Sequence, residues 1–326
     1  MKKPSRKFSY WQSVTTGCLL GLALITLPSQ NESIAQVSFQ PAQIKPVDFT
    51  LPPDSFYPQP EPDLEAPVLT ATGAAVLDRQ SGVFLFLKNP DQPLLPASTT
   101  KIMTALTSLE HYSLLDVLMV PQVFGDGQDM SLVEGELITV QALLHGLLIS
   151  SANDAARVLA QNYPGGQQEF VAAMNQKAKE LGLENTSFVN PSGLDNGDNE
   201  LLTTEESKTS ARDLAWLADQ ALKNETFTQI IATKAITLRD PQGKYYHPLY
   251  NLNQLLWEDP RVKGVKTGWT EKARECLVTL TEQNGHELVY VVLGSTDRFG
   301  ETRQLINWVE NHFRWQEVSP PQSTPD

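Results

Sequence analysis

The amino-acid sequence predicts an α+β fold, in which an antiparallel sheet is built from the two ends of one domain and helices lie between them. Three observations lead to this prediction. Runs rich in β-formers lie at 73–78 and 83–87, and similar runs return at 275–282 and 287–295. The region between them is dominated by helical patterns. The chain of 326 residues shows no internal repeat, and its length suits one large domain or two small ones.

The first 35 residues predict an export signal. Basic side chains come first, and the stretch 14–27 is apolar or small and uncharged. "SIA" at 33–35 then offers the small residues that a signal peptidase recognises. The apolar stretch is shorter than the ~20 residues of a comfortable membrane span, although an uncleaved anchor remains an alternative. Cleavage after Ala35 would leave Cys276 as the only cysteine, and therefore no internal disulfide.

Charge narrows the possible partners. Removal of residues 1–35 takes away four basic residues and one acidic residue, which leaves a net charge near −16. Such a charge argues against nucleic acid and against an anionic membrane surface as partners. We therefore expect an exported protein, periplasmic or extracellular, with no stable membrane anchor once the signal has been cleaved.

The ordered part of the chain is expected to follow a linker. Residues 36–66 hold many prolines and predict an extended segment with little structure of its own. We place one folded domain at 67–316 and a disordered tail at 317–326. Within the domain, "GAAVLD" and "VFLFL" flank "RQSG", which predicts a hairpin.

Helices fill the middle of the domain, and strands return afterwards. The expected helices cover about 98–111, 139–149, 150–163, 168–183 and 210–223, with a last one at about 300–313. Strands are expected at 264–269, 275–282 and 287–295. The last two strands are joined at Asn284-Gly285, which is a strong hairpin signal. For the helix 150–163 we expect a serine start, with Asp154 in the first turn.

The stretch "PASTTKIMTAL" at 96–106 carries the first candidate site. Taken alone, Ser98 could be a helix cap and Lys101 a solvated surface residue. At i and i+3, however, the two side chains lie on one face of a helix. There a lysine amine can take the proton of the serine hydroxyl and make the serine a nucleophile.

Two further clusters follow at intervals of about 50 and 113 residues. "SAN" places Ser151 and Asn153 at the junction of two helices, and "KTG" places Lys266 to Gly268 on a strand. Gly268 removes a side chain there and allows a close approach to the backbone. Each cluster alone fits a structural role. The order S-x-x-K, S-x-N, K-T-G favours the chemical interpretation of all three.

From about Ala66 to Trp315 the sequence resembles the penicillin-binding D-alanyl-D-alanine carboxypeptidases. These are the low-molecular-mass serine peptidases of family S11, which trim peptidoglycan stem peptides. The resemblance is carried by "LDRQSG", "PASTTKIMTAL", "LLISSANDAA", "NTSFVNPSGL", "SARDLA", "NLNQLL", "GVKTGWT" and "VVLGS". It implies the β-lactamase/DD-peptidase-like fold and removal of a terminal D-alanine through an acyl-serine. It further implies a D-Ala-D-Ala stem peptide as substrate, β-lactam antibiotics as covalent inhibitors, and no cofactor or metal.

The resemblance also implies residue roles. Ser98 would be the acylated nucleophile and Lys101 its base. The other expected site residues are Ser151 as a proton relay, Asn153 holding the substrate amide, Lys266 and Thr267 binding the terminal carboxylate, and Gly268 and Trp269 completing the substrate-binding strand. The oxyanion hole would consist of the backbone N–H groups of Ser98 and Trp269.

Two departures from the family pattern concern arginines. Arg274 stands where the family usually has a glycine. The larger side chain could alter the edge of the strand or the access of substrate to the site. The arginine that often follows "VVLGS" could be Arg298 or Arg303.

Three other functions are alternatives to the carboxypeptidase. A peptidoglycan DD-endopeptidase would use the same residues. A class A β-lactamase would need a glutamate with an asparagine four residues later, and between the second and third motifs only Asp195 and Asn199 have that spacing. An inactive wall-binding module would be expected to have lost a motif residue, and none is lost.

Overall fold

The structure is a computed structural model that describes residues 55–62, 65–121, 127–195 and 205–318. The predicted export signal at 1–35 lies outside these residues, as do most of the predicted linker and nearly all of the predicted tail. Within the described part, no helix is long and apolar enough to cross a membrane.

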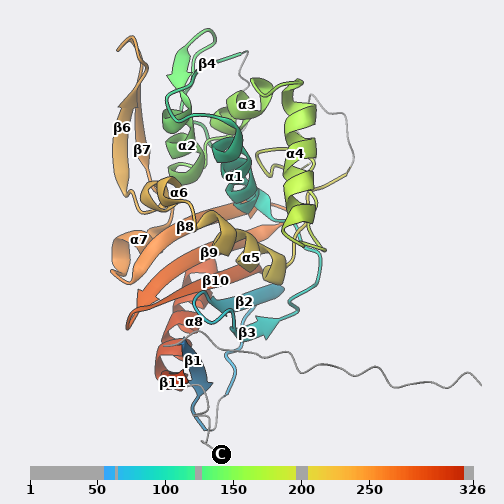
Figure 1. Cartoon of the computed structure of the whole chain (residues 1–326), viewed down its shortest axis with the longest axis vertical. Coiled ribbons are helices and arrows are strands. Elements are labelled where there is room, and N and C mark those ends of the chain that lie inside the picture. Colours follow the sequence, from blue (N-terminus) through green and yellow to red (C-terminus); the bar gives the residue numbers. More distant parts are fainter. Residues whose placement is uncertain (1–54, 63–64, 122–126, 196–204, 319–326) are drawn as a thin grey trace, which may run out of the picture. The chain divides into compact units, whose positions relative to one another are not determined.

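The centre of the fold is a five-stranded sheet in the order β3-β2-β10-β9-β8, with all neighbours antiparallel (Figure 1). The strands are β2 (Gly73–Asp78), β3 (Phe84–Lys88), β8 (Val262–Thr270), β9 (Arg274–Gln283) and β10 (His286–Ser295). The two ends of the domain meet where β2 pairs with β10. The predicted hairpin between β9 and β10 is confirmed, because Asn284 and Gly285 have φ angles of 52° and 83°, as a type I′ turn requires.

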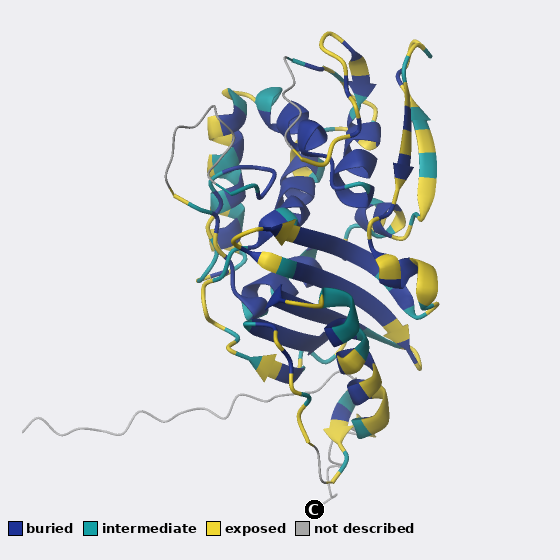
Figure 2. Cartoon of the chain, turned by 180° about the vertical axis from the view of Figure 1, so that it is seen from behind, coloured by how far each residue is buried: buried dark blue, intermediate teal, exposed yellow. Residues whose placement is uncertain are grey.

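Helices lie on both sides of the sheet (Figure 1). The larger group comprises α1 (Lys101–His111), α2 (Val140–Ile149), α3 (Asn153–Gln161), α4 (Gly166–Glu180), α5 (Ala211–Ala221) and α6 (Glu225–Ile231). The short helix α7 (Gln254–Glu258) shares its buried core with α8 instead. Helix α5 packs on β2 and β10, and α8 (Arg298–His312) packs on β9 and β10. Figure 2 shows that the central strands are buried along most of their length.

Alternate residues of each strand enter two different cores. Ala75 and Leu77 of β2 pack with the helices that include α1 and α2, whereas Ala74 and Val76 pack with residues of α8. This follows from the two-residue period of a strand. Since both faces of the sheet are covered, β10 has an almost continuous apolar sequence instead of an alternating one. The predicted α+β class is confirmed.

Three two-stranded sheets were not predicted. They pair β4 (Val117–Met119) with β5 (Leu137–Thr139), β6 (Ala235–Arg239) with β7 (Tyr246–Tyr250), and β1 (Ser55–Pro60) with β11 (Phe313–Val318). The β1 strand lies within the predicted linker and holds two prolines, which weaken any strand prediction because they donate no backbone hydrogen bond. Regular structure therefore reaches beyond both ends of the predicted 67–316 domain.

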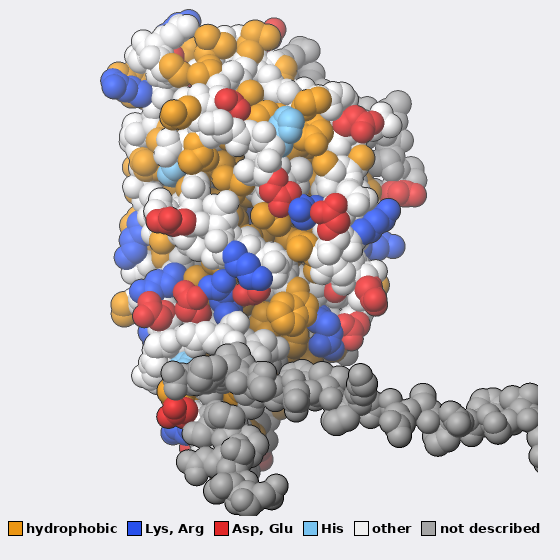
Figure 3. All heavy atoms as spheres, viewed as in Figure 1, with side chains coloured by type: hydrophobic (Ala, Val, Ile, Leu, Met, Phe, Trp, Pro, Cys, Tyr) orange, Lys and Arg blue, Asp and Glu red, His pale blue; other side chains and the backbone are white. Residues whose placement is uncertain are grey.

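Charged side chains are mixed on the surface. On the face drawn in Figure 3, Lys and Arg side chains lie next to Asp and Glu side chains in the lower half. Ion pairs at 2.8 Å between Arg303 and Glu258, and at 3.6 Å between Lys263 and Glu282, are of this exposed kind. Exposed pairs contribute at most about 1 kcal/mol each, so they do not decide the fold.

Candidate active site

Ser98 lies in a single turn of 3₁₀ helix, Ala97–Thr100, immediately before α1. The cap positions of these two helices are Pro96 and Thr100, and neither makes a side-chain cap hydrogen bond. Ser98 itself lies inside the turn and is partly exposed. The alternative in which Ser98 serves only as a helix cap is therefore wrong.

Lys101 is completely buried, which excludes the solvated surface lysine considered above. Its Nζ lies 3.1 Å from Ser98 Oγ, 2.7 Å from Asn153 Oδ1 and 2.5 Å from the backbone oxygen of Ser192. A neutral amine has two N–H donors and one lone pair, so Nζ can donate to the Asn153 and Ser192 oxygens and accept the hydroxyl hydrogen of Ser98. The first and second sequence clusters therefore meet at this nitrogen.

The second cluster lies where α2 ends and α3 begins. Ser151 is 3% exposed and has a φ of 63°, in the left-handed region that a residue with a side chain rarely adopts. The expected helix start at residue 150 is wrong. Helix α3 begins at Asn153, without a side-chain cap.

Asp154, expected to support the first turn of this helix, holds a neighbouring loop as well. Its carboxylate accepts the N–H groups of Met130 and Leu132 at 3.1 Å and that of Ala155 at 2.8 Å. Burial raises the pKa of Asp154, and these hydrogen bonds oppose that rise. The start of α3 is thus attached to the segment 130–132.

The third cluster lies on β8, the edge strand of the sheet next to β9. Lys266 is 1% exposed, and its Nζ donates to the backbone oxygen of Thr267 at 2.9 Å. Burial lowers the pKa of Lys266 well below its usual value, and the positive charges of Lys101 and Arg298 lower it further. The two motif lysines are therefore close enough to affect each other electrostatically.

Gly268 is required by the close passage of β8 over the serine. A Cβ atom at this position would lie 3.1 Å from the backbone nitrogen of Ser98 and 3.2 Å from the backbone oxygen of Pro96. Trp269, the next residue, is 61% exposed. The backbone N–H of Ser98 and the strand that carries Trp269 thus lie side by side, as the predicted oxyanion hole requires.

The turn 190–193, "NPSG", was not predicted as part of the site. Asn190 Oδ1 accepts the N–H groups of Ser192 and Gly193 and the Ser192 hydroxyl. Gly193 has a φ of 80°, and a Cβ there would lie 1.9 Å from the backbone oxygen of Ala97. The turn 190–193 therefore packs closely against the turn that carries Ser98. This packing brings the Ser192 carbonyl within hydrogen-bond distance of Lys101. Its Asn-Pro and Ser-Gly pairs do signal a turn, but they do not reveal which carbonyl points at the lysine.

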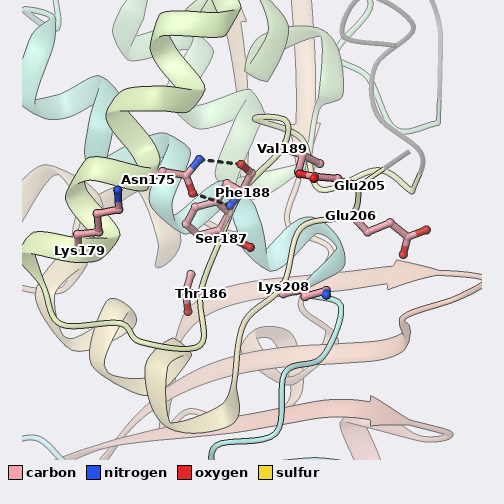
Figure 4. Close-up of a pocket in the computed structure, with 9 residues that line it drawn as sticks. All are labelled: Asn175, Lys179, Thr186, Ser187, Phe188, Val189, Glu205, Glu206 and Lys208. Carbon is pink, nitrogen blue, oxygen red and sulfur yellow. Dashed lines mark hydrogen bonds between the residues drawn. The ribbon is translucent and has the colours of Figure 1, made fainter. Parts of the chain in front are cut away.

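A separate pocket is lined in part by residues 186–189, the segment that leads into this turn (Figure 4). Asn175 of α4 bonds Phe188 twice at 2.8 Å, through its side-chain oxygen and its side-chain nitrogen. None of the predicted site residues lines this pocket. The two hydrogen bonds between Asn175 and Phe188 instead hold the chain in place just before Asn190.

The structure separates the two candidate arginines. Arg298 Nη1 donates to the backbone oxygen of Gly268 at 2.8 Å, and the backbone N–H of Arg298 donates to Glu275 at 2.8 Å. Burial lowers the pKa of Arg298. Arg303 instead forms an exposed ion pair with Glu258. Arg298 is therefore the arginine that lies beside the site.

Arg274 lies at the turn between β8 and β9. It has a φ of 61° and an exposed side chain, and it pairs with Thr270. A glycine adopts this left-handed backbone without strain, which gives a physical reason for the glycine usual in the family. Nearby, the Thr270 hydroxyl donates to Asp195 at 2.9 Å and accepts the Ala273 N–H at 2.9 Å, so the turn is held despite the arginine.

A serine hydroxyl that meets a buried lysine, beside an edge strand bearing Lys-Thr-Gly, is typical of serine hydrolases of the DD-peptidase and β-lactamase type. The chain belongs to the D-alanyl-D-alanine carboxypeptidase family, peptidase S11, whose sequence model matches residues 61–297. The predicted family, fold and enzyme class are confirmed.

Similar proteins agree with this assignment. The chain is 36% identical over 257 residues to the carboxypeptidase DacF of Bacillus subtilis, covering 77% of this chain and 64% of that protein's length. It is 34% identical to a D-alanyl-D-alanine endopeptidase of Pseudomonas aeruginosa, covering 78% and 82% of the two chains. The crystal structure of the Streptomyces K15 DD-transpeptidase matches with a TM-score of 0.69 at 30% identity, covering 76% of this chain and 99% of that one.

Proposed function

We propose that this protein removes the C-terminal D-alanine from peptidoglycan stem peptides through an acyl-enzyme on Ser98, and that penicillin acylates the same hydroxyl. One observation carries the proposal. The buried Lys101 Nζ lies 3.1 Å from Ser98 Oγ and is close enough to Lys266 to lower the pKa of that lysine.

The proposed reaction has two halves. Neutral Lys101 takes the Ser98 proton while Oγ attacks the carbonyl carbon of the penultimate residue. The charge on the carbonyl oxygen is received by the N–H groups of Ser98 and Trp269. The proton then passes to the leaving amine, with Ser151 as relay, and the C–N bond breaks. In the second half, water attacks the ester and releases the shortened peptide.

Lys266 and Thr267 would bind the carboxylate of the terminal D-alanine. Burial and the charges of Lys101 and Arg298 lower the pKa of Lys266, because they disfavour its ammonium form. An arriving carboxylate supplies a counter-charge, so substrate binding would stabilise the ammonium form. A free C-terminus is thereby distinguished from an internal peptide bond.

Replacement of Lys266 by alanine is expected to affect a free C-terminus most. A charge-assisted hydrogen bond contributes roughly 1.5–3 kcal/mol, so kcat/KM on a D-Ala-D-Ala peptide should fall by roughly ten- to a hundredfold. The same peptide with an amidated C-terminus should lose far less. Lys263→Ala on the same strand, whose partner Glu282 is exposed, is the control. Equal losses on both peptides would mean that Lys266 does not recognise the carboxylate.

The KM for the free-carboxylate peptide is expected to rise with pH. Because the pKa of Lys266 is lowered, its charge is lost at a lower pH than the charge of an exposed lysine. Carboxylate binding is therefore strongest below that pKa and weakens above it. Michaelis parameters between about pH 6 and 10 test this expectation. A KM that is constant over the range, or equally pH-dependent for the amidated peptide, would contradict it.

The proposed setting is the cell wall outside the cytoplasm, with the stem peptide as substrate and β-lactams as covalent inhibitors. A DD-endopeptidase is the alternative, because the chain is similar both to a carboxypeptidase and to an endopeptidase. The deciding experiment incubates the protein with a D-Ala-D-Ala pentapeptide and with a cross-linked dimer, and identifies the products by mass. The proposal predicts a tetrapeptide and free D-alanine from the pentapeptide. Cleavage of the dimer alone would favour the endopeptidase, and no turnover of either would contradict both.

A further inference from the structure

His247 of β7 and Glu136 form a buried pair outside the proposed catalytic residues. Their side chains are 2% and 0% exposed, and His247 Nε2 lies 2.7 Å from Glu136 Oε1. The other ring nitrogen, Nδ1, lies 2.8 Å from the backbone oxygen of Met130. The second carboxylate oxygen of Glu136 accepts the N–H of Val133 at 3.1 Å.

These contacts hold the His247 ring at both of its nitrogen atoms. A backbone carbonyl only accepts, so Nδ1–H donates to the Met130 oxygen. Nε2 is bonded to the Glu136 carboxyl group, whose other oxygen accepts the N–H of Val133. The ring and the carboxyl group therefore connect β7 to Met130 and Val133.

The pair is connected to the proposed catalytic centre by a short series of hydrogen bonds. The Met130 carbonyl is bound by His247, and the Met130 N–H is bound by Asp154. Asp154 lies in the first turn of α3, next to Asn153. The Asn153 N–H is bound at 2.7 Å by the backbone oxygen of Gln128, in the same loop as Met130. Asn153 Oδ1 in turn accepts from Lys101 at 2.7 Å.

We propose that His247 is a positioning residue for this reaction. The His247–Glu136 pair holds the segment 128–132 against the start of α3, and so keeps Asn153 on Lys101. The inference rests on the proposed function, because it assigns Lys101 as the base. It predicts that loss of the His247 ring slows the acylation of Ser98.

Glu136→Gln is the informative variant, because it keeps the shape and both hydrogen bonds of the side chain. The amide oxygen can accept the Val133 N–H while the amide nitrogen donates to His247 Nε2. His247→Gln should leave the segment 128–132 poorly held, and His312→Gln, a histidine bonded to Trp308 on α8, is the matched control. Two readouts are measured: the rate of Ser98 acylation by a fluorescent penicillin, and the amide exchange protection of Met130 and Leu132.

The proposal predicts that His247→Gln slows acylation by roughly two- to thirtyfold, the range for residues that act through others, while His312→Gln changes nothing. Glu136→Gln should keep the wild-type rate and the wild-type amide protection, because its amide replaces both hydrogen bonds. Wild-type acylation by His247→Gln would overturn the proposal, as would slow acylation by His247→Gln with unchanged protection of Met130 and Leu132. Absence of any adduct in the wild type would contradict the proposed function instead, and the amide protection would still decide whether the pair holds the loop.

Discussion

Replacing Lys101 with arginine is expected to slow the acylation of Ser98 by about 10²–10⁴-fold, the range that general base catalysis supplies. A base must give up its own charge before it can accept a proton, and an arginine side chain stays protonated in proteins. Lys101 is also completely buried, with three oxygen atoms within 3.1 Å of Nζ. The guanidinium group would therefore not accept the proton, and it is larger than the amine that these oxygens surround.

The acylation rate with a fluorescent penicillin, measured between about pH 5 and 10, checks this expectation. Lys263→Arg makes the same exchange at an exposed position of β8 and should acylate normally. A melting curve separates loss of chemistry from loss of folding. If Lys101→Arg acylated at the wild-type rate, the proton of Ser98 would have to go elsewhere, and the assignment of Lys101 as base would be withdrawn.

Replacing Gly268 with alanine is expected to slow acylation by about 10²–10³-fold, the effect of losing one oxyanion-hole donor. The added Cβ would lie 3.1 Å from the Ser98 nitrogen and 3.2 Å from Ala97 Cβ, closer than backbone neighbours accommodate without moving. Either β8 or the serine turn must shift. The two N–H groups proposed to receive the oxyanion would then no longer point at one place.

Gly243→Ala is the matched control for this change. That glycine lies in the β6–β7 turn with a φ of 71°, and a Cβ there would meet nothing within 4 Å. It introduces backbone strain without any steric contact, so it should lower stability without slowing acylation. Equal acylation rates for Gly268→Ala and the wild type would show that the close approach of β8 to Ser98 has no part in the reaction.

The sequence predicted those parts of the fold that depend on local chemistry. The Asn284-Gly285 turn, the apolar runs of β9 and β10 and the helical pattern of α1 each follow from neighbouring residues. The pairing of β1 with β11 does not, because it joins residues more than 250 positions apart and one strand contains two prolines. Residues 55–60 of the predicted linker 36–66 therefore form a strand that the local sequence does not indicate.

The candidate site shows the same division. Spacing alone placed Ser98 and Lys101 on one helix face, and the structure brings them together. Spacing could not predict the contact between Lys101 and the backbone oxygen of Ser192. Every residue has a backbone oxygen, so the residue type does not indicate which one lies at the lysine. Spacing likewise misjudged the start of α3, where Asp154 binds a loop more than 20 residues earlier in the chain.

The most direct test of the account is the location of the penicillin adduct. The protein is labelled with a fluorescent penicillin and digested, and the modified peptide is sequenced by mass spectrometry, with Ser98→Ala labelled in parallel. We predict a single long-lived adduct on Ser98 and no labelling of the alanine variant. An adduct on another residue, or undiminished labelling of Ser98→Ala, would contradict the assignment of Ser98 as the nucleophile.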